Sequence, residues 1–136
     1  MIFEYDLVVP ANTQANNAAR LDMQLVKGVV HKLAVQFPAG CRSQVLVVIN
    51  RAVHQVWPTN PDGQMKGDFF PIEGPVWYEL DEAPYKLEAY GWSPGTNFNH
   101  TVTIRLWMER KEVLLPGQQA IGIMERLGTL IFGRGK

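Results

Sequence analysis

The chain has 136 residues, of which 46% are hydrophobic and 19% are charged, and its 13 basic residues balance its 13 acidic ones. This length suits one globular domain that buries a core without a metal or disulfide support. A neutral chain with no basic run lacks the charge that binds nucleic-acid phosphates, and no apolar run is long enough to cross a bilayer.

Alternation of apolar and polar residues with a period of two predicts β-strands from the N-terminus onward. Ile2–Val9 alternates large apolar residues with acidic ones, and the Pro- and Asn-rich PANTQANNA that follows is a loop. Further strands are predicted at 20–28 and at 29–37, the second with Val29, His31 and Leu33 on one face. Continuously apolar residues at 45–49 indicate a central strand, which 51–57 continues or bends.

The second half of the chain shows the same period. After the polar loop PTNPDGQMKGD, the prolines and glycines separate three short strands, FFPI, VWYEL and KLEAYGW. Thr101–Met108 alternates most clearly, and its predicted inner face is Val102, Ile104, Leu106 and Met108. About eight strands with regular turn signals predict an all-β fold, an antiparallel β-sandwich of jelly-roll or immunoglobulin-like layout over residues 1–110.

Residues 111–136 follow a different pattern. Apolar residues recur there at helical spacing, but Gly122 and Gly128 would each destabilise a helix by about 1 kcal/mol relative to Ala. We therefore expect a C-terminal arm or short helix that docks on a neighbouring subunit. Its predicted apolar contacts are Leu114, Leu115, Ile121, Met124 and Leu127.

The single cysteine, Cys41, cannot form an intrachain disulfide. A nucleophilic cysteine needs a lowered pKa from a histidine, a cation or a helix N-terminus. Arg42 is adjacent, but a strand follows rather than a helix, so we interpret Cys41 as a packed residue at a corner of the sheet. The start of the chain lacks the basic and apolar regions of a signal peptide, so we expect a protein made in a reducing cytoplasm.

No metal-ligand spacing is present. His31, His54 and His100 lie on separate predicted strands, and we interpret them as ordinary strand residues. The loop residues Asn60, Asp62 and Asp68 offer oxygen ligands for calcium, without the EF-hand spacing, and they are also typical turn residues.

Carboxylates gather near the end of VWYEL. A glycosidase needs two carboxylates roughly 5 to 9 Å apart across a cleft. Glu79, Asp81 and Glu82, with Glu88 nearby, are more typical of a solvated surface. We predict no catalytic residue and no cofactor.

Three aromatic residues are predicted on outward faces. Tyr90 and Trp92 alternate with Leu87 and Ala89, and Trp107 alternates with the inner face of the last strand. Exposed aromatic residues in one patch mark a partner or ligand surface. Such a patch could bind another subunit or stack on sugars; alternatively, bulges near the strand ends could turn these residues inward.

Four turn-and-strand patterns carry a family resemblance: PANT (10–13), FPAGC (37–41), WPTNPDG (57–63) and NHTVTIRL (99–106). With residues 8–108, the chain resembles small β-rich head or decoration proteins encoded among the virion genes of tailed bacteriophages. The resemblance implies a structural role without enzymatic activity, many copies on a shell, and trimers or other cyclic oligomers.

The sequence-based hypothesis is a capsid decoration or cement protein, located in the virion and made in the host cytoplasm. Its expected partners are the major capsid protein and further copies of itself, with a trimer favoured. The alternative is a carbohydrate-binding β-sandwich module that uses Tyr90, Trp92 and Trp107. A third hypothesis is a small hydrolase that depends on Glu79 or Glu88.

Overall fold

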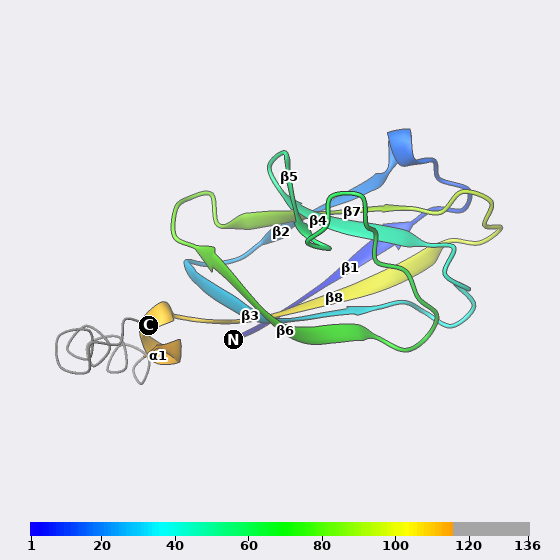
Figure 1. Cartoon of the computed structure of the whole chain (residues 1–136). Helices are drawn as coiled ribbons and strands as arrows, with labels where there is room; N and C mark the ends of the chain where they lie inside the picture. Colours follow the sequence, from blue (N-terminus) through cyan, green and yellow to red (C-terminus); the bar gives the residue numbers. More distant parts are fainter. Residues whose placement is uncertain (116–136) are drawn as a thin grey trace, which may run out of the picture.

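The structure, a computed structural model, describes residues 1–115 (Figure 1). Eight strands form two antiparallel sheets of four strands each. The first sheet contains, in spatial order, β1 (Ile2–Val9), β8 (His100–Glu109), β3 (Gly28–Gln36) and β6 (Ile72–Leu80). The second contains β2 (Ala19–Gln24), β7 (Lys86–Trp92), β4 (Leu46–Arg51) and β5 (His54–Trp57). The 3₁₀-helix η1 (Ala15–Asn17) precedes β2, and a single helical turn, α1 (Lys111–Leu114), follows β8.

The strand order distinguishes between the two layouts that the sequence left open. Strand β1 pairs with β8, β2 with β7, β3 with β6 and β4 with β5. The chain therefore folds back on itself at the β4–β5 turn, so that each strand before the turn pairs with its counterpart after the turn. This nesting is the jelly-roll arrangement, whereas an immunoglobulin-like sandwich pairs its first strand with its second. The predicted β-sandwich is confirmed, and the topology makes it a jelly-roll.

The core lies between the two sheets, where the period-two alternation placed it. All four predicted inner residues of β8, Val102, Ile104, Leu106 and Met108, are fully buried. They meet inward side chains of the second sheet in one hydrophobic cluster, which includes Met23, Val47, Ile49, Leu87 and Ala89. Because apolar side chains recur at every second position, each strand contributes one face to this cluster.

The predicted inner face of β3, with Val29 and His31 beside Leu33, is wrong because the strand contains a β-bulge. The register with β8 shifts between Val30 and Lys32, so His31 is an extra residue in β3 relative to β8. Val30, and not Val29, therefore joins Leu33 in the core. A bulge reverses the alternation locally, and simple counting along the sequence does not detect it.

The predicted interruption of the strand at Gly74-Pro75 is wrong. The strand runs without interruption from Ile72 to Leu80 and pairs only with β3, so it is an edge of the first sheet. Proline has no N–H to donate, and an edge strand has one side on which none is required. Of the predicted strand FFPI, only Ile72 belongs to β6. In the segment 51–57, Arg51 ends β4, residues 52–53 form a turn, and His54–Trp57 is the separate strand β5.

The two ends of the sandwich differ. The N-terminus and α1 lie at one end (Figure 1), where the Met108 amide donates a 2.7 Å hydrogen bond to the Met1 carbonyl. The β3–β4 and β7–β8 loops lie at the opposite end. Of the predicted arm, residues 111–115 are described, whereas Ile121, Met124 and Leu127 lie outside the described residues. Within residues 1–115, no helix is long and apolar enough to cross a membrane.

Candidate interaction surface

The three predicted outward aromatic residues are partly exposed, but they do not form one patch. Tyr90 and Trp92 are on β7, on the face opposite the buried Leu87 and Ala89. Trp107 is on β8, in the other sheet. The outer faces of a sandwich point away from each other, so the expectation of a single aromatic patch is wrong. A sugar platform shared by Tyr90, Trp92 and Trp107 loses its geometric basis.

Cations cover two of these rings. The Lys32 ammonium lies 4.7 Å from the centroid of the Trp107 ring, and the Arg20 guanidinium lies 5.9 Å from that of Tyr90. Both distances allow cation–π attraction. The two rings are therefore engaged with neighbouring side chains of their own sheets.

The edge strand β6 and the residues that precede it carry exposed apolar side chains that the sequence analysis did not select. We call them the β6 strip: Phe69, Phe70, Ile72 and Trp77. Phe70 is 75% exposed and Trp77 is 47% exposed, and the rings of Phe69 and Phe70 pack edge to face 5.2 Å apart. Several large apolar side chains exposed along one edge are unusual for an isolated domain and mark a contact surface. The signal in the sequence was FFPI followed by VWYEL, which was interpreted only as strand material.

The chemistry of the β6 edge favours side-chain contacts over strand addition. An exposed edge normally offers free backbone N–H groups to another strand. Pro75 within β6 and Pro71 immediately before it have no backbone N–H, so two of these donors are missing. A partner would therefore cover the apolar side chains of the strip without extending the sheet.

The start of the predicted arm is attached beside this strip. The Lys111 ammonium in α1 donates a hydrogen bond of 3.0 Å to Glu79 Oε1, and the Trp77 indole N–H donates one of 2.9 Å to Glu79 Oε2. These contacts, Trp77 first and then Lys111, lower the pKa of Glu79 below its ordinary value. Leu114 and Leu115, two of the predicted arm contacts, are partly exposed next to this junction.

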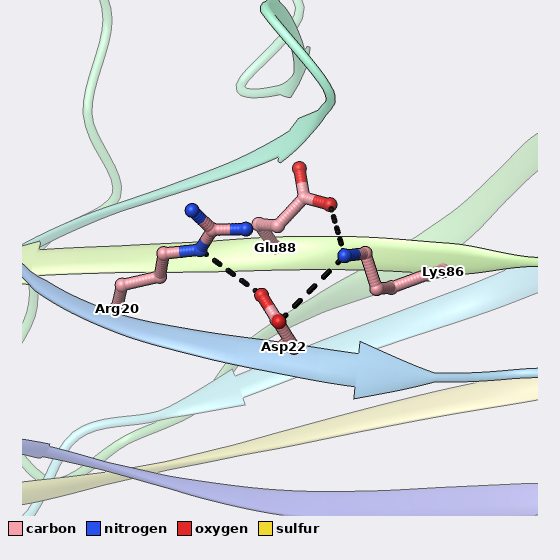
Figure 2. Close-up of polar contacts among 4 residues, drawn as sticks. All are labelled: Arg20, Asp22, Lys86 and Glu88. Carbon is pink, nitrogen blue, oxygen red and sulfur yellow. Dashed lines mark hydrogen bonds and ion pairs between the residues drawn. The ribbon is translucent and has the colours of Figure 1, made fainter. Parts of the chain in front are cut away.

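A second polar cluster lies on the outer face of the second sheet (Figure 2). Asp22 accepts a 3.0 Å hydrogen bond from Arg20 Nε and lies 3.6 Å from Lys86 Nζ, which is also 3.6 Å from Glu88. Glu88 is only 4% exposed. Two cations thus balance two carboxylates, as is typical of an ion-pair network on a sheet face.

The carboxylates weighed for hydrolysis are not brought together. Glu79 is on β6 in the first sheet, and Glu88 is on β7 in the second. Both project from outer faces, because their neighbours Leu80 and Leu87 are fully buried. The structure therefore does not place this pair across one cleft, as glycosidic cleavage requires.

The candidate metal ligands are also dispersed. Asp68 Oδ1 accepts hydrogen bonds from the backbone amides of Gly40 and Cys41, at 2.7 and 3.1 Å, while Asp62 accepts one from the side-chain amide of Asn60. His54 is in the second sheet, and His31 and His100 are in the first. No three His, Cys, Asp or Glu side chains in the part of the chain that the structure describes form a group that could hold a metal ion.

Cys41 is a packed residue, as the sequence indicated. It has no solvent exposure and belongs to the core cluster, at the corner between β3 and β4. Burial, with a further contribution from Asp68, raises the pKa of its thiol to about 11. The reactive thiolate is therefore scarce near neutral pH.

Comparison with known proteins gives distant structural likenesses only. No protein-family model matches the chain, and no curated protein matches it. An exo-beta-1,3-galactanase from Phanerochaete chrysosporium, solved with galactose, is 14% identical with a TM-score of 0.39; the match covers 79% of this chain and 27% of that one. A family two carbohydrate esterase from Cellvibrio japonicus is 10% identical with a TM-score of 0.35, covering 79% and 34%.

A third likeness is to a protein of Bacillus endospore appendages, which form disulfide-linked pili. It is 12% identical with a TM-score of 0.34, and the match covers 80% of this chain and 90% of that one. The chain thus spans about a third or less of the galactanase and esterase chains. All three TM-scores lie below 0.5, so these likenesses do not identify what this chain binds or does.

Proposed function

We propose that this chain is a structural component of an assembly, specifically a decoration or cement protein of a tailed-phage head that binds coat subunits and copies of itself. The observation that carries the proposal is the β6 strip, a set of exposed apolar side chains on a free edge strand, of which Trp77 lies next to the start of the C-terminal arm. Jelly-roll domains occur both in viral capsids and in lectins, so the fold alone does not select a function.

The proposed mechanism is burial of the strip across a seam between subunits. Removing apolar area from water stabilises a contact by about 25 cal/mol per Å². Phenylalanine and tryptophan offer the largest area per side chain and are common energetic centres of interfaces. Repetition of one such contact over many positions on a shell would add avidity to a weak single contact.

The arm extends the same surface. Its start is held against β6 by the Lys111–Glu79 contact, and Leu114 and Leu115 follow Lys111 within one helical turn. We infer that the strip and the arm contact the same neighbouring subunit. In a closed cyclic oligomer, with a trimer favoured, the strip of each subunit would be covered by a neighbouring subunit.

The double variant Phe70→Lys/Trp77→Lys tests this proposal by placing two charges in the strip. Light scattering after size exclusion should show the unaltered chain as an oligomer of its 15.4 kDa subunit. The variant should associate about tenfold more weakly or worse, because the charges must be desolvated at the interface. Val53→Lys is the matched control, since Val53 is 88% exposed on the β4–β5 turn, away from the strip.

A monomer of the unaltered chain at every concentration would refute self-association. Equal weakening by Val53→Lys and by the strip variant would refute the role of the strip.

A further inference from the structure

A groove opens between the β3–β4 loop and the β7–β8 loop. Both loops lie at the end of the sandwich opposite α1 (Figure 1). Its volume is about 720 Å³, within the range of sites that hold small organic ligands. The side chains that give it chemical character are Arg42, Gln44, Asn97, Phe98, Asn99 and His100. None of these belongs to the β6 strip.

The walls of the groove are held in place by hydrogen bonds from behind. Asp68 accepts the amides of Gly40 and Cys41 and so fixes the β3–β4 loop. On the other wall, the Thr96 hydroxyl donates to the Ser93 carbonyl at 3.0 Å, and Asn99 Oδ1 accepts the Ala11 amide at 2.9 Å. A preformed site lowers the entropy that a ligand must lose on binding.

The groove carries one permanent positive charge, that of Arg42, and three side-chain amide groups, those of Gln44, Asn97 and Asn99. Arg42 and His100 are the ionisable side chains of its lining, which contains no carboxylate. The Asn99 oxygen is occupied by Ala11, which leaves its amide nitrogen available as a donor. A ligand that supplies oxygen atoms, one group of them negatively charged, would satisfy this set.

Phe98 adds an apolar contact. Its side chain is 74% exposed at the rim, between two asparagines. An exposed ring flanked by amide side chains suits a molecule with one apolar face and many hydroxyl groups, since the ring covers the face and the amides bind the hydroxyls.

We propose that this groove binds an acidic saccharide. The Arg42 guanidinium pairs with the sugar carboxylate in a charge-assisted, bidentate contact. Asn97, Asn99 and Gln44 hydrogen-bond its hydroxyl groups, and Phe98 packs on the C–H face of the ring. The groove is at the end of the sandwich opposite Trp77 and α1, so a shell whose subunits dock through Trp77 and α1 would still present it.

Titration of the full chain with trigalacturonic acid and with 3′-sialyllactose, followed by amide chemical shifts and by calorimetry, tests the proposal. Lactose is the neutral probe, and inorganic phosphate is the anion without a sugar. We expect saturable binding of at least one acidic saccharide, with shifts centred on 95–101, and about tenfold weaker binding of lactose.

Two variants and two matched controls assign the site. Arg42→Gln and Phe98→Ala should each weaken binding of the acidic saccharide about tenfold, since each removes a charge-assisted or stacking contact. Arg110→Gln removes the same charge at the far end, and Trp77→Ala removes an exposed ring beside α1, so both should leave binding unchanged. The amide spectrum of each variant checks that the sandwich is folded.

Four outcomes overturn the proposal: no binding of either acidic saccharide, equal binding of lactose, equal binding of phosphate, or unchanged affinity in the folded Arg42→Gln protein. Because a Trp77→Lys protein, altered only beside α1, should bind the saccharide as the unaltered chain does, failure of this proposal is distinguishable from failure of the assembly function.

Discussion

Gly91 lies at a point of close contact between the two sheets. It is on the inner face of β7, after Leu87 and Ala89, and a Cβ there would lie 2.6 Å from Val9 Cγ2 and 2.9 Å from Leu7 Cδ2. Contacts this short do not occur in packed proteins, so a side chain at this position would push β1 and β7 apart. A glycine in a strand otherwise weakens it, so close approach of the opposite sheet accounts for its presence here.

We predict that Gly91→Ala destabilises the sandwich by about 1–3 kcal/mol, the usual effect of overpacking a filled core. Denaturant unfolding followed by tryptophan fluorescence measures the change. Gly74→Ala on β6 is the control, because a Cβ there meets no atom within 4 Å. Equal stability of the Gly91→Ala and Gly74→Ala proteins would show that the sheets are less tightly packed at this point than the structure indicates.

Among the elements, β6 combines structural and functional roles. It closes the first sheet as an edge strand, carries Ile72 and Trp77 of the strip, and holds α1 through Glu79. The Trp77 indole and the Lys111 ammonium both bind the Glu79 carboxylate, so both contacts need its ionised form. The junction between the strand and the arm therefore depends on the charge of one side chain.

The pH dependence of this junction follows from the lowered pKa of Glu79. A carboxyl whose pKa is lower in the folded state contributes stability above its ordinary pKa and loses it as the pH falls through the folded value. We predict that α1 detaches on acidification in that range. Carboxyl carbon shifts of Glu79 and amide exchange at Leu114 and Leu115 report the two events.

Substitutions at the two donors should separate their contributions. Trp77→Phe and Lys111→Met should each raise the pKa of Glu79, because the indole hydrogen bond is the first cause of the lowered value and Lys111 adds both a hydrogen bond and a charge. Lys66→Met, an exposed lysine outside the junction, should leave that pKa unchanged. An unchanged pKa of Glu79 in both junction variants would show that these contacts do not hold the carboxylate in solution.

At the scale of the whole molecule, the described core is completed by residues 1–109. All eight strands contribute residues to the buried hydrophobic cluster, whereas α1 has no buried residue. The nested topology also joins the first strand to the last, since β1 pairs with β8 along its whole length. The sandwich is therefore expected to be independent of the arm.

We predict that deletion of residues 113–136 leaves the sandwich folded and weakens assembly. Near-ultraviolet circular dichroism and thermal unfolding should match those of the full chain, because the core cluster described within residues 1–115 lies entirely before residue 113. Light scattering should show a smaller oligomer or a larger dissociation constant. An unchanged oligomer would indicate that the strip acts without the arm, and loss of the folded signal would indicate that the arm contributes to the core.

The positions of the strands and their inner faces could be predicted from local pattern. The inner face of β8 was correct at each of its four residues, and Cys41 was correctly interpreted as packed. The β3 bulge, the continuity of β6 through Pro75 and the exposure of Phe69, Phe70 and Trp77 were not predicted. Each depends on what lies beside the strand, which the strand's own residues do not specify.

The sequence by itself determined the class of fold, because the alternation of apolar and polar residues is a local property that each strand carries alone. Only the tertiary structure decided which surfaces exist. Tyr90 and Trp107 have the same local pattern, yet β7 and β8 pair with different partners and face away from each other. The groove likewise joins loops about fifty residues apart, at 38–44 and 95–101. Long-range strand pairing brings such segments together, because hydrogen bonds between strands form wherever the packing of the whole chain places them.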